Sequence, residues 1–285
     1  MSDEALLLGP ERSNVGVFTT GSDLSVNKSK TAVIFITAGL LHHVGPHRLH
    51  VLLARRLATK GISSLRIDLS GIGDSLPRSD DLAAEEIAVQ EINDAIHLLE
   101  SRGFTRFILF GICSGAVQAI KVAANNSKIA GIVLINTGSD DGNTEANTEA
   151  ALQFYLQRSI LNINAWKNLF TGKVNYTALF VTLFSAIKQK ISSSSSKAKK
   201  RSFEDELQQM TSSYQQQDTA ILMIMSDRHA QYYSLYKTVF DKAENDHFKA
   251  LFYPKTDHLF TSLSAQKDLI DEVCQWSDVL AEKNL

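Results

Sequence analysis

Six short runs rich in Val, Ile, Leu and Phe constrain the fold of this chain more than any other feature. Their apolar residues mostly stand at consecutive rather than alternate positions, which is typical of parallel strands covered on both faces. Segments with helical periodicity separate the runs, and this alternation predicts an α/β fold with a mostly parallel central sheet and helices on both faces. The predicted strands are Thr31–Thr37, Ser63–Asp68, Arg106–Gly111, Ile129–Asn136, Thr219–Met225 and Lys249–Tyr253, with an N-terminal edge strand at Val15–Thr20. The predicted helices are His47–Lys60, Ala84–Arg102, Ser114–Ala124 and Ala265–Leu280.

The composition argues against two classes of protein. The 285 residues carry a formal net charge of -2, so there is no basic surplus for binding nucleic acid. The N-terminal segment starts acidic and is a poor secretory signal, and the most apolar later stretch, Tyr176–Ile187, is too short to span a bilayer. We therefore expect a cytoplasmic protein that binds neither nucleic acid nor membrane, and we expect no metal and no cofactor.

One region interrupts the alternation of strands and helices. From Asn143 to Gln217 no strand-like run is followed by a helix in the expected order, and two apolar stretches, Ala150–Leu161 and Tyr176–Ile187, fit helices. A serine run and a basic segment follow over residues 192–201, which is typical of a flexible linker. The sequence thus predicts a core made of residues 1–142 and 218–285 and a helical lid made of residues 143–217.

A glycine-rich turn joins the third apolar run to the helix that follows it. The turn spans Gly111–Gly115 with the sequence GICSG, the pattern of a nucleophile elbow, whose central residue stands exposed in a strained turn. Its place at a helix N-terminus favours a thiolate, so Cys113 is the predicted nucleophile. The other cysteine, Cys274, stands in a helical pattern and is interpreted as packing. A reducing compartment suits these roles better than a disulfide.

Such a nucleophile needs a base, and the base needs a group that orients it. His258 directly follows the last strand-like run, where an order of nucleophile, acid and histidine would place the base. Asp227 follows the strand Thr219–Met225 and is our choice for the acid. Asp140 and Asp141, after the preceding strand, are the alternatives, and an ordinary turn or capping role remains open for all three aspartates.

The loop after the first predicted strand is the predicted oxyanion loop. We expect the amides of Leu40 and Ser114 to hold the oxyanion and Gly39 to let the backbone approach the substrate. His43 and Arg48 are candidates for binding an anionic substrate group. For Arg48 we prefer a structural role, as a cap or as the partner of a carboxylate.

A second glycine-containing loop follows the strand Ser63–Asp68. It has the pattern D-x-x-G-x-G-x-S over residues 68–75. Its glycines suit a tight loop leaving the sheet, and its polar residues can cap and brace that loop. We interpret it as structural support of the site rather than as part of the chemistry.

With these motifs in place, the chain resembles the α/β-hydrolase superfamily over nearly its whole length. Three segments, Val44–Arg48, Arg66–Ser75 and Gly111–Ala116, are similar to cysteine-type hydrolases associated with bacterial exosortase systems, which are often labelled serine aminopeptidase-like. The resemblance implies the α/β-hydrolase fold and a Cys–His–Asp triad, and Cys113 and His258 match that pattern.

The chain departs from the family pattern at two positions. The acid of many relatives stands two residues beyond Asp227, where this chain has His229. Ala38 replaces the histidine of the common His-Gly pair, which leaves the backbone donor of the oxyanion loop intact. The first departure is the reason that the choice of acid stays open.

These parts predict a reaction. The Cys113 thiolate attacks an acyl carbonyl with His258 as general base, and water releases the thioacyl-enzyme. We therefore expect an ester or thioester hydrolase (a thioesterase in the second case) acting on a small acyl substrate, free or bound to a carrier. An acyltransferase or cyclase with the same intermediate is the alternative, because cysteine variants of the family include both dienelactone hydrolases and polyester synthases. A non-catalytic binding protein on a hydrolase scaffold is the second alternative. The oligomeric state is left open.

Overall fold

The computed structural model describes residues 2–22, 30–78, 82–137, 210–227, 230–242 and 247–282. The chain divides into two compact units, one made of Met1–Gly138 and Glu204–Leu285 and the other of Ser139–Phe203. The second unit lies outside the described residues, so the helical lid predicted over 143–217 and the serine-rich segment stay predictions. Residues 210–217, which we assigned to the lid, belong to the first unit. There the hydroxyl of the buried Tyr214 donates a hydrogen bond of 2.6 Å to the Ile120 carbonyl.

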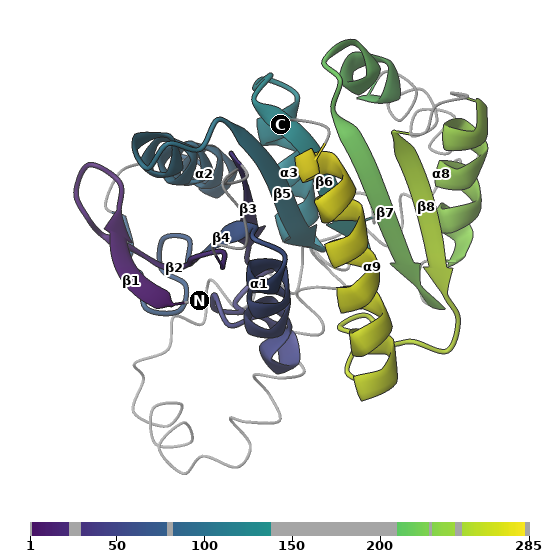
Figure 1. The fold of residues 1–285 in the computed structure, drawn as a ribbon, viewed down its shortest axis with the longest axis horizontal. Helices are drawn as coiled ribbons and strands as arrows, with labels where there is room; N and C mark the ends of the chain where they lie inside the picture. Colours follow the sequence, from purple (N-terminus) through teal and green to yellow (C-terminus); the bar gives the residue numbers. More distant parts are fainter. Residues whose placement is uncertain are drawn as a thin grey trace, which may run out of the picture. The chain divides into compact units, whose positions relative to one another are not determined.

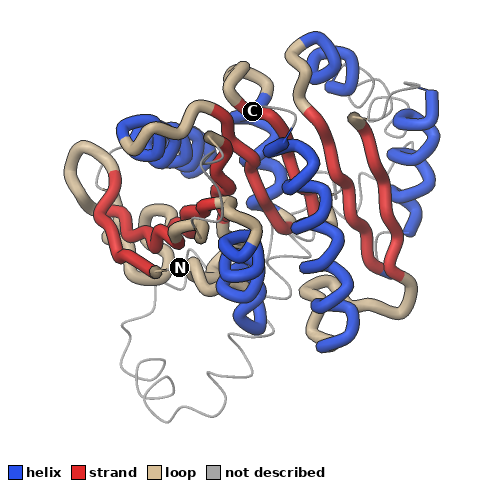
Figure 2. Tube along the Cα trace, viewed as in Figure 1, coloured by secondary structure: helices blue, strands red, loops and turns tan. Residues whose placement is uncertain are grey.

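The described residues of the first unit form an eight-stranded sheet, and the predicted α/β architecture is confirmed (Figure 1). Figure 2 shows the strands as a single layer with helices packed around it. The strand order is β1-β2-β4-β3-β5-β6-β7-β8, and all neighbours from β4 to β8 are parallel. The parallel strands are β3 (Thr31–Ile36), β4 (Ser63–Ile67), β5 (Arg106–Ile112), β6 (Ile129–Ile135), β7 (Ala220–Ser226) and β8 (Phe248–Tyr253).

The N-terminal part of the sheet differs from the prediction. The strand expected at the edge, β2 (Asn14–Thr19), pairs antiparallel with β4 on one side and with β1 (Asp3–Leu8) on the other. The edge is therefore β1, whose acidic and exposed start gave no strand signal in the sequence. The exposed acidic residues at the start of β1, Asp3 and Glu4, act against pairing of this edge with other chains.

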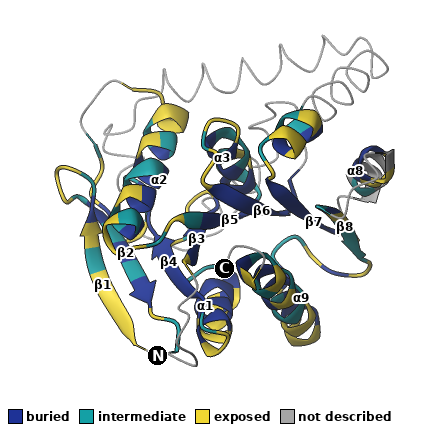
Figure 3. Cartoon of the chain, turned by 45° about the horizontal axis from the view of Figure 1, so that its top comes forward, coloured by how far each residue is buried: buried dark blue, intermediate teal, exposed yellow. Residues whose placement is uncertain are grey.

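Helices cover both faces of the sheet, as Figure 3 shows. On one face lie α1 (Leu49–Thr59) and α9 (Leu263–Glu282), and on the other lie α2 (Ala84–Ser101) and α3 (Ser114–Ala123). A helix that we did not predict, α8 (Ala230–Lys242), packs on β7 and β8; its several aromatic residues are weak helix formers. None of the helices in the described residues combines the length and the apolar character needed to cross a bilayer.

The start of the first predicted helix needs a correction. We expected it at His47, but α1 begins at Leu49, after the short 3-10 helix η1 (Pro46–Arg48). His47 and Arg48 both have left-handed backbone conformations, with φ of 47° and 64°. Two consecutive non-glycine residues in this region cannot continue a right-handed helix, and each costs about 1 kcal/mol or more.

A histidine lies in the core between α1 and the sheet. His50 is 1% exposed, and the rings of Phe35 and Phe110 lie 5.3 and 5.5 Å from its own. Burial lowers the pKa of His50 to about 3, and the positive charge of Arg66 adds to this effect. The folded protein therefore keeps this imidazole neutral at mildly acidic pH.

We expect His50 to make the protein sensitive to acid. Since its pKa is lowered from 6.5 to about 3 on folding, the unfolded chain binds a proton between these values and the folded protein does not. The contribution of the neutral His50 to the free energy of unfolding is fully present well above pH 6.5 and is lost as the pH falls. Between pH 7 and pH 5 the loss is about 2 kcal/mol. Urea unfolding at pH 7 and at pH 5 measures this loss. Between these two pH values, the free energy of unfolding of His50→Leu should fall by about 2 kcal/mol less than that of the wild type. Equal losses in the two proteins would contradict the assignment.

Candidate active site

Cys113 stands in the tight turn between β5 and α3, as the glycine pattern predicts. Its backbone has φ 52° and ψ -117°, a conformation that is strained for any residue other than glycine. Its amide donates a hydrogen bond of 2.9 Å to the carbonyl of Ile135 at the end of β6. The side chain is half-buried and its thiol is free. The turn thus holds a free thiol, partly accessible, at the N-terminus of a helix.

The two glycines of the elbow allow α3 to pack closely against the sheet. A Cβ at Gly111 would lie 2.4 Å from the carbonyl carbon of Gly115. A Cβ at Gly115 would lie 2.8 Å from the carbonyl oxygens of Ile36 and Thr37, at the end of β3. Because these contacts involve backbone atoms, no side-chain movement could relieve them.

The loop after β3 meets the elbow through a hydrogen bond from the Gly39 amide to Ser114 Oγ, 2.9 Å long. The Leu41 amide donates to the Ala38 carbonyl, which folds residues 38–41 into a tight turn with φ 54° at Gly39. The Gly39 amide is thereby occupied, whereas Leu40 is 73% exposed and its amide has no acceptor among the described residues. This geometry agrees with Leu40 and Ser114 as the two oxyanion donors, an assignment that stays a prediction.

His258 lies in the loop that joins β8 to α9. Its carbonyl accepts a hydrogen bond of 2.7 Å from the side chain of Asn136, the residue that follows Ile135. Cys113 and His258 are therefore bound to adjacent residues at the carboxyl end of β6. In parallel sheets, ligands bind at this edge, near the place where the strand order reverses, which here is between β3 and β5.

The predicted acid lies beside the same loop. The amide of Asp227, directly after β7, donates a hydrogen bond of 3.2 Å to the carbonyl of Thr256, two residues before His258. The Asp227 carboxylate is exposed and has no hydrogen bond to a described residue. Asp140 and Asp141 lie outside the described residues. The structure therefore brings the backbone of Asp227 to the His258 loop, and the choice of acid stays a prediction.

Asp257 has a different function from its neighbour His258. Its carboxylate accepts hydrogen bonds from the amide of Leu259 and from the amide and hydroxyl of Thr261. Partial burial would raise the pKa of Asp257, but these hydrogen bonds outweigh it and hold the pKa below its usual value. The carboxylate therefore shapes the loop that carries the predicted base.

A family model matches most of the chain. The model of the family Hydrolase_4, described as serine aminopeptidase, S33, matches residues 28–273. The chain belongs to this family. The match confirms the resemblance to the α/β-hydrolase superfamily, but the family is named for serine enzymes, whereas the elbow here carries Cys113.

Solved structures share the fold of this α/β hydrolase. A thermostable carboxyl esterase from Bacillus coagulans matches with a TM-score of 0.59 and 11% identity, covering 98% of each chain. An esterase from Pyrococcus furiosus has a TM-score of 0.58 and 13% identity, covering 99% of this chain and 90% of its own. A dienelactone hydrolase from Anabaena variabilis has a TM-score of 0.55 and 12% identity, covering 96% of each chain. At such low identity the likeness shows the fold alone. A search of curated proteins found no match.

The loop with the pattern D-x-x-G-x-G-x-S supports the segment that follows the turn at residues 38–41 of this hydrolase. Its first residue, Asp68, is buried and accepts hydrogen bonds from the His43 amide, from His43 Nδ1 at 2.8 Å and from the Asp74 amide at 3.0 Å. Burial would raise the pKa of Asp68, but the hydrogen bonds from His43 and Asp74 hold it below its usual value. Ser75 Oγ joins the loop to β2 by accepting from the Val15 amide at 2.8 Å.

His43 and Arg48 differ in how far they remain available to a substrate. His43 Nδ1 is bound to Asp68 and its side chain is only 12% exposed, so Nε2 alone could face an anionic group. His43, Asp68 and Asp74 have potential ligand atoms within 4.8 Å of one another, but both Asp68 oxygens already accept hydrogen bonds, and we assign no metal there. Arg48 is exposed, and its guanidinium has no partner among the described residues, which leaves its predicted contact with an anion as a prediction.

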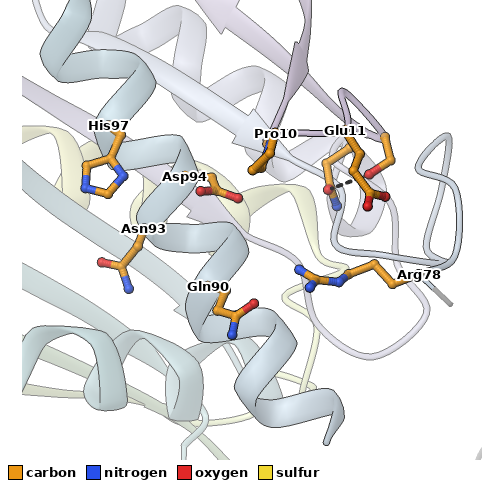
Figure 4. A pocket seen from close by; sticks show the side chains of 10 residues that line it. Pro10, Glu11, Arg78, Gln90, Asn93, Asp94 and His97 are labelled. Atoms are coloured by element: carbon orange, nitrogen blue, oxygen red, sulfur yellow. Dashed lines mark hydrogen bonds between the residues drawn. The ribbon is translucent and has the colours of Figure 1, made fainter. Parts of the chain in front are cut away.

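A pocket of about 410 Å³ opens elsewhere on the first unit (Figure 4). It lies between the turn that joins β1 to β2 and the outer side of α2, and none of the predicted site residues lines it. Burial raises the pKa of Asp94 in its wall, against the opposing charges of His97 and Arg78. The lining residues are Gly9, Pro10, Glu11, Ser13, Asn14, Arg78, Gln90, Asn93, Asp94 and His97. The pocket therefore takes no part in the site assigned here.

Proposed function

We propose that this α/β hydrolase cleaves an acyl ester or thioester through a thioacyl-enzyme formed on Cys113. One observation carries the proposal: Cys113, with a free and half-buried thiol, stands in the strained elbow, and its backbone amide and the His258 carbonyl are hydrogen-bonded to adjacent residues at the end of β6. The proposed substrate is a small acyl compound, free or bound to a carrier. A reducing compartment such as the cytoplasm suits an enzyme that needs this thiol free.

In the proposed mechanism, His258 takes the proton of the Cys113 thiol, and the thiolate attacks the acyl carbonyl. The amides of Leu40 and Ser114 donate hydrogen bonds to the oxyanion. When the tetrahedral intermediate collapses, the bond to the leaving alcohol or thiol breaks and His258 returns the proton to that group. His258 then removes a proton from water, whose oxygen attacks the thioester and releases the acid and the free thiol. Asp227 is the proposed acid that orients His258.

Cys113 also indicates which subgroup of the family the chain belongs to. We infer that the chain belongs with the cysteine-type hydrolases that resemble the exosortase-associated group, on the strength of the GICSGA segment. A thioester intermediate also reacts with amines and thiols, so an acyltransferase or cyclase would use the same residues.

The test is to incubate the protein with acetyl, butyryl and octanoyl p-nitrophenyl esters and with matching thioesters, and to record intact mass beside product release. We expect an acyl adduct that maps to Cys113 and fast release in water. An adduct that water releases slowly but an amine or thiol releases quickly would identify a transferase. No adduct and no turnover with any donor would contradict the proposal and favour the binding-protein alternative.

A further inference from the structure

Asn136, the first residue after β6, is held in place by its backbone. Its φ of 49° lies in the left-handed region, and its amide donates a hydrogen bond of 2.9 Å to the Ile224 carbonyl of β7. The residue is 2% exposed. A polar side chain buried to this degree needs hydrogen-bond partners, so the identity of these partners indicates its role.

The carboxamide of Asn136 connects two loops of the site. Its Nδ2 donates to the carbonyl of His258 at 2.7 Å, and its Oδ1 accepts from the amide of Ser226 at 2.7 Å. Only this orientation gives the carbonyl a donor and the amide an acceptor. Ser226 is fully buried and directly precedes Asp227, so one side chain holds the loop of the predicted base and the segment of the predicted acid.

The nucleophile is held from the same place. The Cys113 amide donates to the carbonyl of Ile135, the residue before Asn136. The relative position of Cys113 and His258 therefore depends on two consecutive residues at one strand end. Asn136 and His258 are 122 residues apart in the sequence, so only the folded chain brings them together.

We infer that Asn136 is a positioning residue that sets the His258 imidazole relative to the Cys113 thiol. The inference rests on the proposed function. Asn136 acts through the backbone of His258 and does not touch the substrate. A displacement of about 1 Å in the position of a reacting group can cost about 10²-fold in rate. Loss of the Nδ2 donor should therefore lower kcat more than it raises KM.

Two variants separate the contacts of Asn136. Asn136→Asp keeps an acceptor for the Ser226 amide but presents oxygen instead of N–H to the His258 carbonyl. Asn136→Gly removes both contacts without adding charge, and glycine accepts the left-handed backbone. Asn125→Asp is the matched control, because the exposed Asn125 also donates through Nδ2 to a backbone carbonyl, that of Lys121, away from the site.

The experiment measures kcat and KM with p-nitrophenyl butyrate and the rate of Cys113 alkylation by iodoacetamide between about pH 5 and pH 9. For both Asn136 variants we expect kcat to fall about 10- to 100-fold with KM within about 3-fold. The onset of fast alkylation should move to higher pH, since a displaced imidazole stabilises the thiolate less. Asn125→Asp should match the wild type in each measurement. The ionisable residues in the two segments that Asn136 joins are Asp227, Lys255, Asp257 and His258 itself.

The remaining outcomes overturn the inference. If both Asn136 variants kept the alkylation profile and the kcat of the wild type, the inference would be wrong. It would also be wrong if the pH of fast alkylation shifted in Asn136→Asp but not in Asn136→Gly, since that shift would come from the added charge alone. Failure of both variants to fold, judged by circular dichroism, would assign Asn136 to the fold only. A wild type without adduct or turnover would instead contradict the proposed function, and the inference would fall with it.

Discussion

Cys113→Ala is expected to lower kcat/KM for p-nitrophenyl butyrate by about 10⁴-fold or more and to abolish the acyl adduct. The alanine cannot form a thioacyl-enzyme, and residual turnover can come only from binding and from the oxyanion donors. The fold should be unaffected, because the methyl group fits wherever the CH₂ of cysteine fits. Intact mass and initial rates, recorded on the same sample, measure both effects.

Cys274 provides the matched control for this variant. It lies on α9 with 3% exposure, and burial raises the pKa of its thiol to about 12. Cys274→Ala should therefore retain the adduct and the turnover, and iodoacetamide should alkylate the native wild-type protein once, at Cys113. Turnover that persists in Cys113→Ala but disappears in another variant would show that the nucleophile had been assigned to the wrong residue.

Gly111→Ala is expected to lower the free energy of unfolding by about 4 kcal/mol or more, beyond the range of ordinary substitutions. The new methyl would lie 2.4 Å from the carbonyl of Gly115 and 2.5 Å from the Ala116 amide, so α3 would have to move away from the sheet. The loss is steric, because the backbone of Gly111 is not in the left-handed region. Urea unfolding of the purified protein measures it.

Gly103 allows the steric effect to be separated from the conformational one. It follows α2 with φ 93°, and a Cβ there would meet no atom within 4 Å. Gly103→Ala should therefore cost only about 1 kcal/mol, through backbone strain. If Gly111→Ala and Gly103→Ala lowered the free energy of unfolding equally, close packing of the elbow would not explain why a glycine is needed at position 111.

Features that depend on neighbouring residues could be predicted from the sequence. The parallel strands followed from their runs of apolar residues, because a strand covered on both faces is buried at every position. The elbow at Cys113 followed from the glycines at positions 111 and 115, whose effect is felt within one turn of chain. The position of His258 after the last strand followed from chain order alone.

Other features arise only when distant segments meet. The link from Asn136 to His258 spans 122 residues, and the bond from His43 to Asp68 spans 25, so no local pattern marks either pair. Local propensity does not predict three further features, which the sequence analysis therefore missed. They are the left-handed backbone at His47 and Arg48, the edge strand β1 and the helix α8. The parallel strands, the elbow and the family resemblance can be predicted from the sequence, since they depend on local sterics and burial. The hydrogen bonds that join Cys113 and His258 to adjacent residues at the end of β6 arise from the tertiary structure, because bonds between distant segments form only once the sheet has brought its strand ends together.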